Sequence, residues 1–492
     1  PEKKTITYQD ARFEFFGVPV FYSPFFQHPD PSVKSATGLL MPTIGGSSTL
    51  GTVVEVPYHI ALAPSYDLLF HPMYMSKYGI LYKGDFRHAT RIGDATGMYT
   101  LNLAAIDQTS NPPGYGASQS DFRASVDTHG RFSLSSWWKF GWDYTGATDN
   151  SFRRFYKLDG LLESDRVNSA FITGLSDRNY FATYLYKVGG LLQANTQQTQ
   201  GQALPVVDYS YIFADPILGG ELSFNGNALS FTQDQTFTDG TGMVRNVNSR
   251  MNRVVANLGW RKKIVDPIGQ TFTPFVQARG DVISANDAVN PYTRLVIDDE
   301  TAVRAVGTAG VLYSYPFVAN TPNASHVVEP IGQVIARQAK VDQRNLPNID
   351  SRSVVHDDIN LFEVDKLTGY DRIETGVRAN YGLQYTYQAN TGGSMRFLAG
   401  QSQHLTGDNI YKNPGYDAYG QPLYSIQNGL ERSAADYVMG LYLSPVAPFK
   451  AAARVSPGRL ACRRASSNQR RPSCRCPWIY QNMANAAARR AP

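Results

Sequence analysis

The chain has 492 residues, of which 42% are hydrophobic, 12% aromatic and 18% charged, and its formal net charge is +5. The charged fraction lies below the roughly 25% of soluble domains, and the high aromatic content excludes a chain that is disordered as a whole. No stretch approaches the roughly 18 consecutive apolar residues of a membrane-spanning helix, so such a span is excluded.

The net charge is unevenly distributed along the chain. Residues 450–492 contain ten basic side chains and no acidic one, so the other 449 residues carry a net charge of −5. All three cysteines, Cys462, Cys474 and Cys476, lie in this basic tail, which leaves no disulfide framework or thiolate metal site in the body. The basic balance therefore does not indicate a nucleic-acid partner. Because the chain begins at Pro1 and shows no signal peptide, we expect a fragment or a processed chain.

Alternation of apolar and polar residues, which places them on opposite faces of a β-strand, is the dominant pattern. In chain order, the clearest segments with this pattern are Ile80–Arg87, Arg131–Trp142, Val254–Trp260, Val276–Val282 and Val377–Tyr387. Helical stripes of useful length are hard to find. The sequence therefore predicts a mostly β chain.

Clusters rich in Gly, Asn, Asp and Pro separate these strands, for example residues 107–116, 234–242 and 409–421. Long loops alternating with short turns, strands of about ten residues and aromatic residues near strand ends are typical of a transmembrane β-barrel. A soluble β-sandwich or solenoid shows the same alternation. A sandwich of this length would need several domains, and no linker rich in Pro, Gly and Ser divides the body. The pattern therefore favours one large antiparallel transmembrane barrel.

Motifs for enzyme chemistry are scarce. The sequence has no GxSxG elbow, no P-loop, no HExxH and no GxGxxG that opens a helix, and its eight histidines are scattered without ligand spacing. An acidic run could offer oxygen ligands to Ca²⁺, but its spacing matches no calcium loop, so a solvated loop or charges facing a lumen are favoured. We expect neither an enzyme nor a cofactor or metal site. The acidic run consists of Asp357, Asp358, Glu363, Asp365, Asp371 and Glu374.

Two long strings carry a resemblance to a known family. The first is VPVFYSPFFQHPDP at residues 18–31, followed by SATGLLMPTIGGSSTLGTVVEVPYHIALAPSYDLLFHPMYMSKYGILYKGDFRH through His88. The second lies in residues 327–387 and contains VVEPIGQV and NIDSRSVVHDDINLFEVDKLTGYDRIETGVRANYGLQY. The chain resembles the LPS-assembly protein LptD (OstA/Imp) family. The first string is similar to the junction where the family's periplasmic jelly-roll leads into its barrel, and the second to a mid-barrel segment.

The resemblance implies a large outer-membrane β-barrel of a Gram-negative bacterium that delivers lipopolysaccharide to the outer leaflet. The implied partners are lipopolysaccharide, an LptE-like plug lipoprotein, outer-membrane lipids, and an LptA-like periplasmic bridge protein that docks on the jelly-roll. Residues 1–34 would be the end of the jelly-roll and residues 35–455 an incomplete barrel. After Val455 the alternation stops, so we expect residues 456–492 to be an atypical basic tail that is disordered or comes from a shifted reading frame.

The resemblance also assigns two prolines, Pro42 and Pro57, to a lateral gate. Proline cannot donate to a sheet ladder, so each would weaken a seam by about one net hydrogen bond, ~1 kcal/mol. Gly45, Gly46 and Gly51 fit a flexible seam but are equally ordinary turn glycines, and the prolines could simply start or end strands. The alternative functions are a porin or transporter for another solute and a secreted structural or adhesive β-protein.

Overall fold

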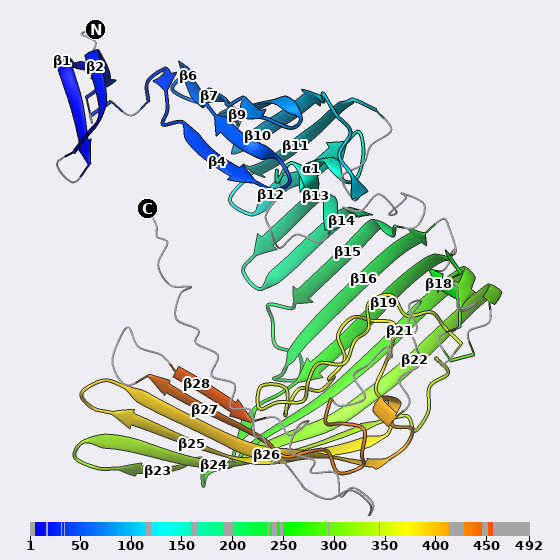
Figure 1. Ribbon diagram of the computed structural model, residues 1–492. Helices are drawn as coiled ribbons and strands as arrows, with labels where there is room; N and C mark the ends of the chain where they lie inside the picture. The colour runs from blue at the N-terminus through cyan, green and yellow to red at the C-terminus, as the bar shows by residue number, and fades with distance from the viewer. Residues whose placement is uncertain are drawn as a thin grey trace, which may run out of the picture.

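The chain forms a large curved antiparallel sheet with a separate hairpin at its N-terminal end (Figure 1). In this computed structural model 66% of the described residues are in strands, which confirms the predicted all-β class. The structure describes residues 5–15, 18–30, 32–33, 35–114, 120–158, 165–190, 200–233, 237–238, 244–246, 249–290, 292–293, 296–343, 345–412, 428–444 and 451–455.

The N-terminal hairpin and the first, short strands of the sheet are β1 (Thr5–Phe15), β2 (Val18–Pro29), β3 (Gly38–Leu39), β4 (Thr43–Ser47), β5 (Gly51–Glu55), β6 (Tyr58–Ala63), β7 (Tyr66–Phe70) and β8 (Met73–Met75). The wall continues through β9 (Gly79–Ile92), β10 (Ala95–Asp107), β11 (Phe122–Ser133), β12 (Trp138–Ala147), β13 (Asp165–Ser176), β14 (Asn179–Gly190), β15 (Gln202–Ile212), β16 (Glu221–Gln233), β19 (Ser249–Arg261), β20 (Ile264–Val265), β21 (Thr271–Val289), β22 (Val296–Ser314), β23 (Phe317–Asn320), β24 (Ala324–Arg337), β25 (Val377–Ala389), β26 (Ser394–Thr406), β27 (Val438–Ser444) and β28 (Ala451–Val455). Outside the wall lie α1 (Phe152–Phe155), β17 (Phe237–Thr238), β18 (Val244–Asn246) and the 3-10 helix η3 (Ile410–Lys412).

The sheet is a continuous antiparallel wall that stays open at one place. Two short ladders, β3–β6–β7 and β4–β5–β8, both attach to β9, and pairing then proceeds in chain order to β28. The longest ladder joins β21 and β22, of 19 residues each. Among the described residues no ladder joins β28 to β3 or β4, so these strands are the two free edges of the open sheet (Figure 1).

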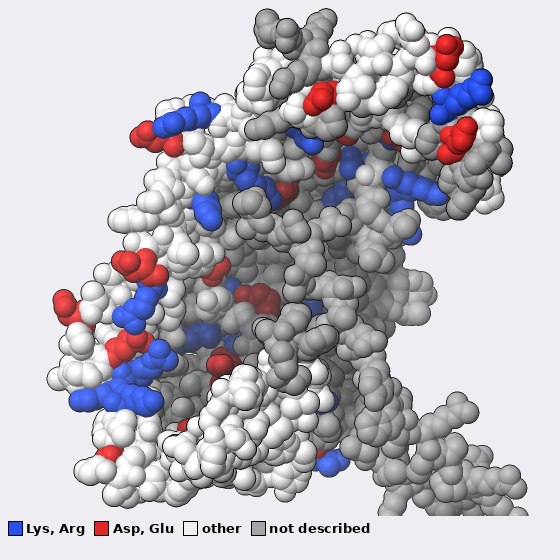
Figure 2. All heavy atoms as spheres, turned by 90° about the vertical axis from the view of Figure 1, so that its left-hand side faces the viewer, with Lys and Arg blue, Asp and Glu red and all other residues white. Residues whose placement is uncertain are grey.

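The two faces of the wall have opposite chemistry. On β19, Val254 and Leu258 are 60% and 45% exposed on the outer face, whereas Arg253 on the inner face is 2% exposed. Figure 2 looks into the hollow of the sheet and shows acidic and basic side chains along its inner wall. Polar residues inside and apolar residues outside are the arrangement of a transmembrane β-barrel.

The segment from Arg131 to Trp142, predicted as one strand, is a hairpin. The chain reverses between β11 and β12, where the Leu134 and Ser135 amides both donate to the Trp138 carbonyl oxygen. The Ser135 hydroxyl accepts the amides of Trp137 and Trp138 at 3.2 and 3.1 Å and stabilises the turn. The prediction of a single strand was wrong because the alternation passes through this polar turn without a break.

Buried apolar side chains form small clusters rather than one core. The largest groups Phe152 and Phe155 of α1, the α-helix of the described residues, with Met73, Met75 and Leu81 of β8 and β9. A second cluster surrounds Leu367 and a third surrounds Met251. The clusters fix loops to the wall.

The hairpin β1–β2 pairs within itself and lies apart from the wall (Figure 1).

In the described segments no helix is long and apolar enough to cross a membrane. The basic tail, residues 456–492, with all three cysteines, falls outside the described residues, as do most of the predicted loops 234–242 and 409–421.

Candidate functional site

Pro57 lies between β5 and β6, at a position where a backbone donor is missing from the sheet. Its carbonyl oxygen accepts the Leu40 amide at 2.9 Å. A hydrogen-bonded pair in an antiparallel ladder normally exchanges two such bonds. Since proline has no N–H, the reciprocal bond from residue 57 to the Leu40 carbonyl cannot form. The pairing between the first two broken strands is therefore reduced at this point.

Pro42 lies between β3 and β4, beside the free edge of the sheet. The Val56 amide donates to the Pro72 carbonyl oxygen, which is on the side away from β4. Backbone groups of successive strand residues point to opposite sides, so Glu55 faces β4, where it is paired with Thr43. Pro42 precedes this pair directly and, as a proline, has no N–H to donate to either neighbour.

The three glycines named with these prolines differ in their roles. Gly51 follows the turn after β4 and has a φ of 78°, so it is a turn glycine. Gly45 and Gly46 lie inside β4, paired with Val53 and Thr52.

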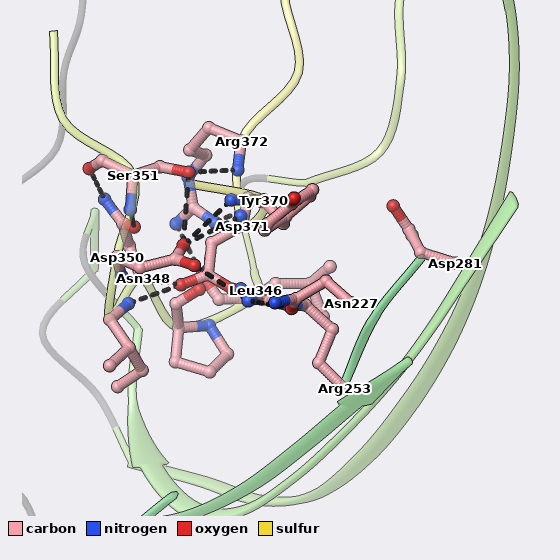
Figure 3. A network of polar contacts seen from close by, with 12 residues as sticks. Asn227, Arg253, Asp281, Leu346, Asn348, Asp350, Ser351, Tyr370, Asp371 and Arg372 are labelled. Atoms are coloured by element: carbon pink, nitrogen blue, oxygen red, sulfur yellow. Dashed lines mark hydrogen bonds and ion pairs between the residues drawn. The ribbon is translucent and has the colours of Figure 1, made fainter. Parts of the chain in front are cut away.

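The inner face of the wall carries a folded segment, residues 345–376, here called the luminal segment, which connects toward β25 (Figure 1). Its main attachment is an ion-pair network with wall strands (Figure 3). Arg253 on β19 donates to both Asp371 and Asp350, the latter at 2.7 Å, and also to Asn227 on β16 at 2.8 Å. The second oxygen of Asp371 accepts the Ile349 and Asp350 amides at 2.6 and 3.0 Å.

Two further wall arginines continue this network. Arg304 on β22 binds Asp281 on β21 through two hydrogen bonds of 2.6 and 3.0 Å, and it donates to the Asp371 carbonyl oxygen at 2.7 Å. Arg279 also donates to Asp281, at 2.9 Å, and contacts the Tyr370 carbonyl oxygen. Carboxylates and guanidinium groups buried without water need such pairing, so the contacts fix the segment in one place.

A second buried network lies at the end of the luminal segment. Glu374, 2% exposed, is paired with Arg378 at 3.3 Å and Arg337 at 3.5 Å, and it accepts a hydrogen bond from Tyr411. Lys366 donates through its Nζ to three carbonyl oxygens of residues 360, 361 and 363, at 2.8 to 2.9 Å. These three hydrogen bonds link residues of the luminal segment to one another and stabilise its fold.

Glycines of three neighbouring strands let the luminal segment approach the wall closely. A side chain at Gly400 on β26 would collide with Leu361, and one at Gly440 on β27 would collide with Asp358. Gly382 on β25, opposite Gly400 in the ladder, lies beside Phe362. We call Gly382, Gly400 and Gly440 the glycine cradle, since it accommodates the segment where larger residues would displace it.

Asp358 connects the luminal segment to the last strands before the free edge. It accepts a hydrogen bond from the Tyr442 hydroxyl on β27 at 2.6 Å and lies 3.7 Å from the guanidinium of Arg454 on β28. The Arg454 Nε donates to the same hydroxyl at 3.1 Å. The segment thus bridges the middle of the wall and the strands at its end.

Burial and charge shift the pKa values of groups in the luminal segment. Burial raises the pKa of Glu374, but the positive charges of Arg378 and Arg337 outweigh it and hold this pKa below its usual value. Burial lowers the pKa of Lys366 to about 8. Burial, together with the charge of Lys366, lowers the pKa of His356 to about 4. His356 is therefore neutral at pH 7.

The acidic run belongs to these networks, so the prediction of a solvated loop is wrong for three of its members. Asp358, Asp371 and Glu374 are 3%, 0% and 2% exposed and face inner-wall arginines or tyrosines. They lie on the inner side of the wall, but they are paired there with wall residues and do not face an open lumen. Within the described part of the chain, no group of three or more His, Cys, Asp or Glu side chains is arranged to hold a metal ion.

The sequence interpretation missed the wall arginines. Arg253, Arg279, Arg304, Arg337 and Arg378 lie on the polar faces of five strands. The recurrence of arginine on polar faces, together with an acidic segment of matching size, was the available signal.

Three known proteins that this chain resembles carry the same name. The sequence pattern of the family described as LPS transport system D, LptD, matches residues 121–468. LPS-assembly protein LptD of Haemophilus influenzae is 24% identical over 414 residues, 82% of this chain and 51% of the relative. The protein of the same name from Shewanella denitrificans is 24% identical over 410 residues, 82% and 50% of the two chains. That of Idiomarina loihiensis is 41% identical over 99 residues, 20% and 13%. The chain spans about half the length of the first two relatives.

Proposed function

The chain belongs to the LptD family, and from this premise we propose that it assembles lipopolysaccharide in the outer membrane of a Gram-negative bacterium. In this proposal the protein is a transport and assembly protein, not an enzyme. The wall spans the membrane, with its apolar face toward lipid and its charged face toward the lumen. The sugar portion of lipopolysaccharide passes along the polar lumen while the acyl chains leave sideways into the outer leaflet.

The observation that carries this proposal is the broken edge of the sheet. An amphiphile must reach the bilayer without crossing a closed ladder, so a barrel that releases it needs a seam that can part. Pro57 removes one backbone bond from the first pairing, and Pro42, beside the free edge, has no N–H to donate. We propose that both are residues of a lateral gate.

The runner-up function, a porin, is less well supported. A porin conducts solutes through a water-filled lumen. Here the luminal segment lies on the inner wall, and its side chains are buried there by ion pairs. Conductance of small solutes that does not depend on lipopolysaccharide would favour the porin.

The proposed partners follow from the family. A lipoprotein of the LptE kind would fill the lumen, and a bridge protein of the LptA kind would dock on the jelly-roll of which β1 and β2 are the last strands. The position of this hairpin, paired within itself and apart from the wall, supports a separate periplasmic element (Figure 1).

Controlled depletion of the protein in its native host tests the proposal. Antibody labelling of intact cells measures lipopolysaccharide at the surface, and total lipopolysaccharide is measured in lysates. We expect the surface fraction to fall while the total persists. An unchanged surface fraction after depletion would refute the function.

A further inference from the structure

We propose that Pro72 is a third gate residue, which extends the weakened pairing from the first ladder to the second; the inference rests on the proposed function. Pro42, Pro57 and Pro72 follow one another at intervals of fifteen residues. Each lies between the two halves of a broken strand: β3 and β4, β5 and β6, β7 and β8.

The hydrogen bonds around Pro72 repeat those around Pro57. The Pro72 carbonyl oxygen accepts the Val56 amide at 3.2 Å. The register is the same on both sides, since Glu55 is opposite Met73 and Tyr58 is opposite Phe70. The reciprocal bond, from residue 72 to the Val56 carbonyl oxygen, is missing because proline has no N–H. Two successive ladders thus lose the same bond at the same level.

The row of missing backbone bonds at Pro57 and Pro72, here called the weakened line, ends at β9. This strand runs unbroken for 14 residues and pairs with β8 through Gly79–Leu81 and with β7 through Gly84–His88. Where the line meets β9, the His71 amide donates to the Lys83 carbonyl oxygen at 2.9 Å. The three broken strands therefore lie between the unbroken strand β9 on one side and the free edge of the sheet on the other.

Polar side chains connect the neighbouring strands near the positions where backbone hydrogen bonds are missing. The His71 ring bridges Glu55 at 2.7 Å and Asp85 at 2.9 Å, and the Lys83 Nζ binds Glu55 at 2.9 Å. Glu55 ends β5 two positions before Pro57, and His71 directly precedes Pro72. We call these four residues the polar clasp. A connection made by side chains can be released without unfolding the strands on either side.

A proline elsewhere in the wall provides the matched control. Pro330 lies inside β24, and its carbonyl oxygen accepts the Tyr315 amide at 3.2 Å. It lacks the same reciprocal bond as Pro72, but β24 and its neighbour β25 continue through this level in register. Pro330 is therefore equivalent to Pro72 in hydrogen bonding and different in position.

The test compares Pro72→Ala with Pro330→Ala in the full gene product, expressed in the native host in place of the wild type. Each substitution restores one donor, so hydrogen exchange at the opposite amide, Val56 or Tyr315, should slow about fivefold, the change expected for one hydrogen bond. Surface lipopolysaccharide should fall severalfold in Pro72→Ala and stay at the wild-type amount in Pro330→Ala. A merely structural role for Pro72 would not couple tighter pairing to poorer delivery.

Pro72→Val repeats the test should Pro72→Ala not accumulate, and His71→Ala, which opens the polar clasp, should speed exchange at Val56. Unslowed exchange at Val56 in both Pro72 variants would overturn the inference. So would wild-type surface lipopolysaccharide in a Pro72 variant whose Val56 exchange is slowed. If depletion of the wild-type protein leaves surface lipopolysaccharide unchanged, the proposed function fails instead, and the exchange comparison still decides whether Pro72 weakens the ladder.

Discussion

Arg253 and Asp371 are separated by 118 positions in the sequence and form an ion pair in which both side chains are almost completely buried. One belongs to the wall and the other to the luminal segment. Their contact helps to join the loop between β24 and β25 to the wall strand β19 (Figure 3).

Removing the negative charge of this pair should release the luminal segment. In Asp371→Asn the Arg253 guanidinium loses its most buried partner but keeps Asp350, so the cost should lie below the about 3–5 kcal/mol of an uncompensated buried charge. Hydrogen exchange over residues 345–376 should become at least tenfold faster. Asp143→Asn breaks the exposed pair with Arg131, which is worth at most about 1 kcal/mol, and serves as the control. Equal effects of the two variants would contradict the buried network.

Filling the glycine cradle should displace the luminal segment without removing any charge. In Gly400→Val the new side chain would occupy the position of Leu361. We expect a loss of about 1–3 kcal/mol, typical of overpacking, and faster proteolysis within residues 345–376. Gly280 on β21 has open space where a Cβ would be, so Gly280→Ala should leave the proteolysis rate unchanged. A wild-type rate in Gly400→Val would show that the segment does not lie on the cradle.

Acid should weaken the luminal segment through His356. Its pKa is lowered to about 4 by burial and by the charge of Lys366, whereas an unfolded histidine titrates near 6.5. Between these values the unfolded state binds a proton that the folded state does not, so the stability due to His356 is present above pH 6.5 and declines as the pH falls toward 4. Exchange over residues 345–376 should be faster at pH 5 than at pH 7, after correction for intrinsic rates. His356→Gln should reduce this difference, and an equal pH response in the variant would refute the assignment.

The apolar cluster at α1 should stabilise strands β8 and β9, which contribute side chains to it. Phe152 is fully buried against the cluster that includes Met73, Met75 and Leu81. Phe152→Ala should cost about 3–5 kcal/mol and speed exchange in β8 and β9. The exposed Leu218, 84% accessible, provides a substitution to alanine with little expected cost. Similar exchange in the two variants would mean that α1 does not support these strands.

The sequence predicted the wall because strand alternation is a local property. Val254 and Arg253 are adjacent, and their opposite chemistry already reports two faces. The prediction of strands from alternation failed at Ser135, where the alternation continued through a turn. The luminal segment was beyond reach for a different reason: whether Asp371 is solvated or paired depends on an arginine more than a hundred residues away, and spacing along the chain carries no record of that contact.

The most direct test of the account combines Pro42→Val with Pro57→Val in the full gene product, because both substitutions return backbone donors to the broken edge. The measurement is surface lipopolysaccharide on intact cells, with the amount of protein in the outer membrane determined in parallel. We predict normal protein amounts and a severalfold fall in surface lipopolysaccharide. Normal surface lipopolysaccharide in the double variant would contradict the lateral gate.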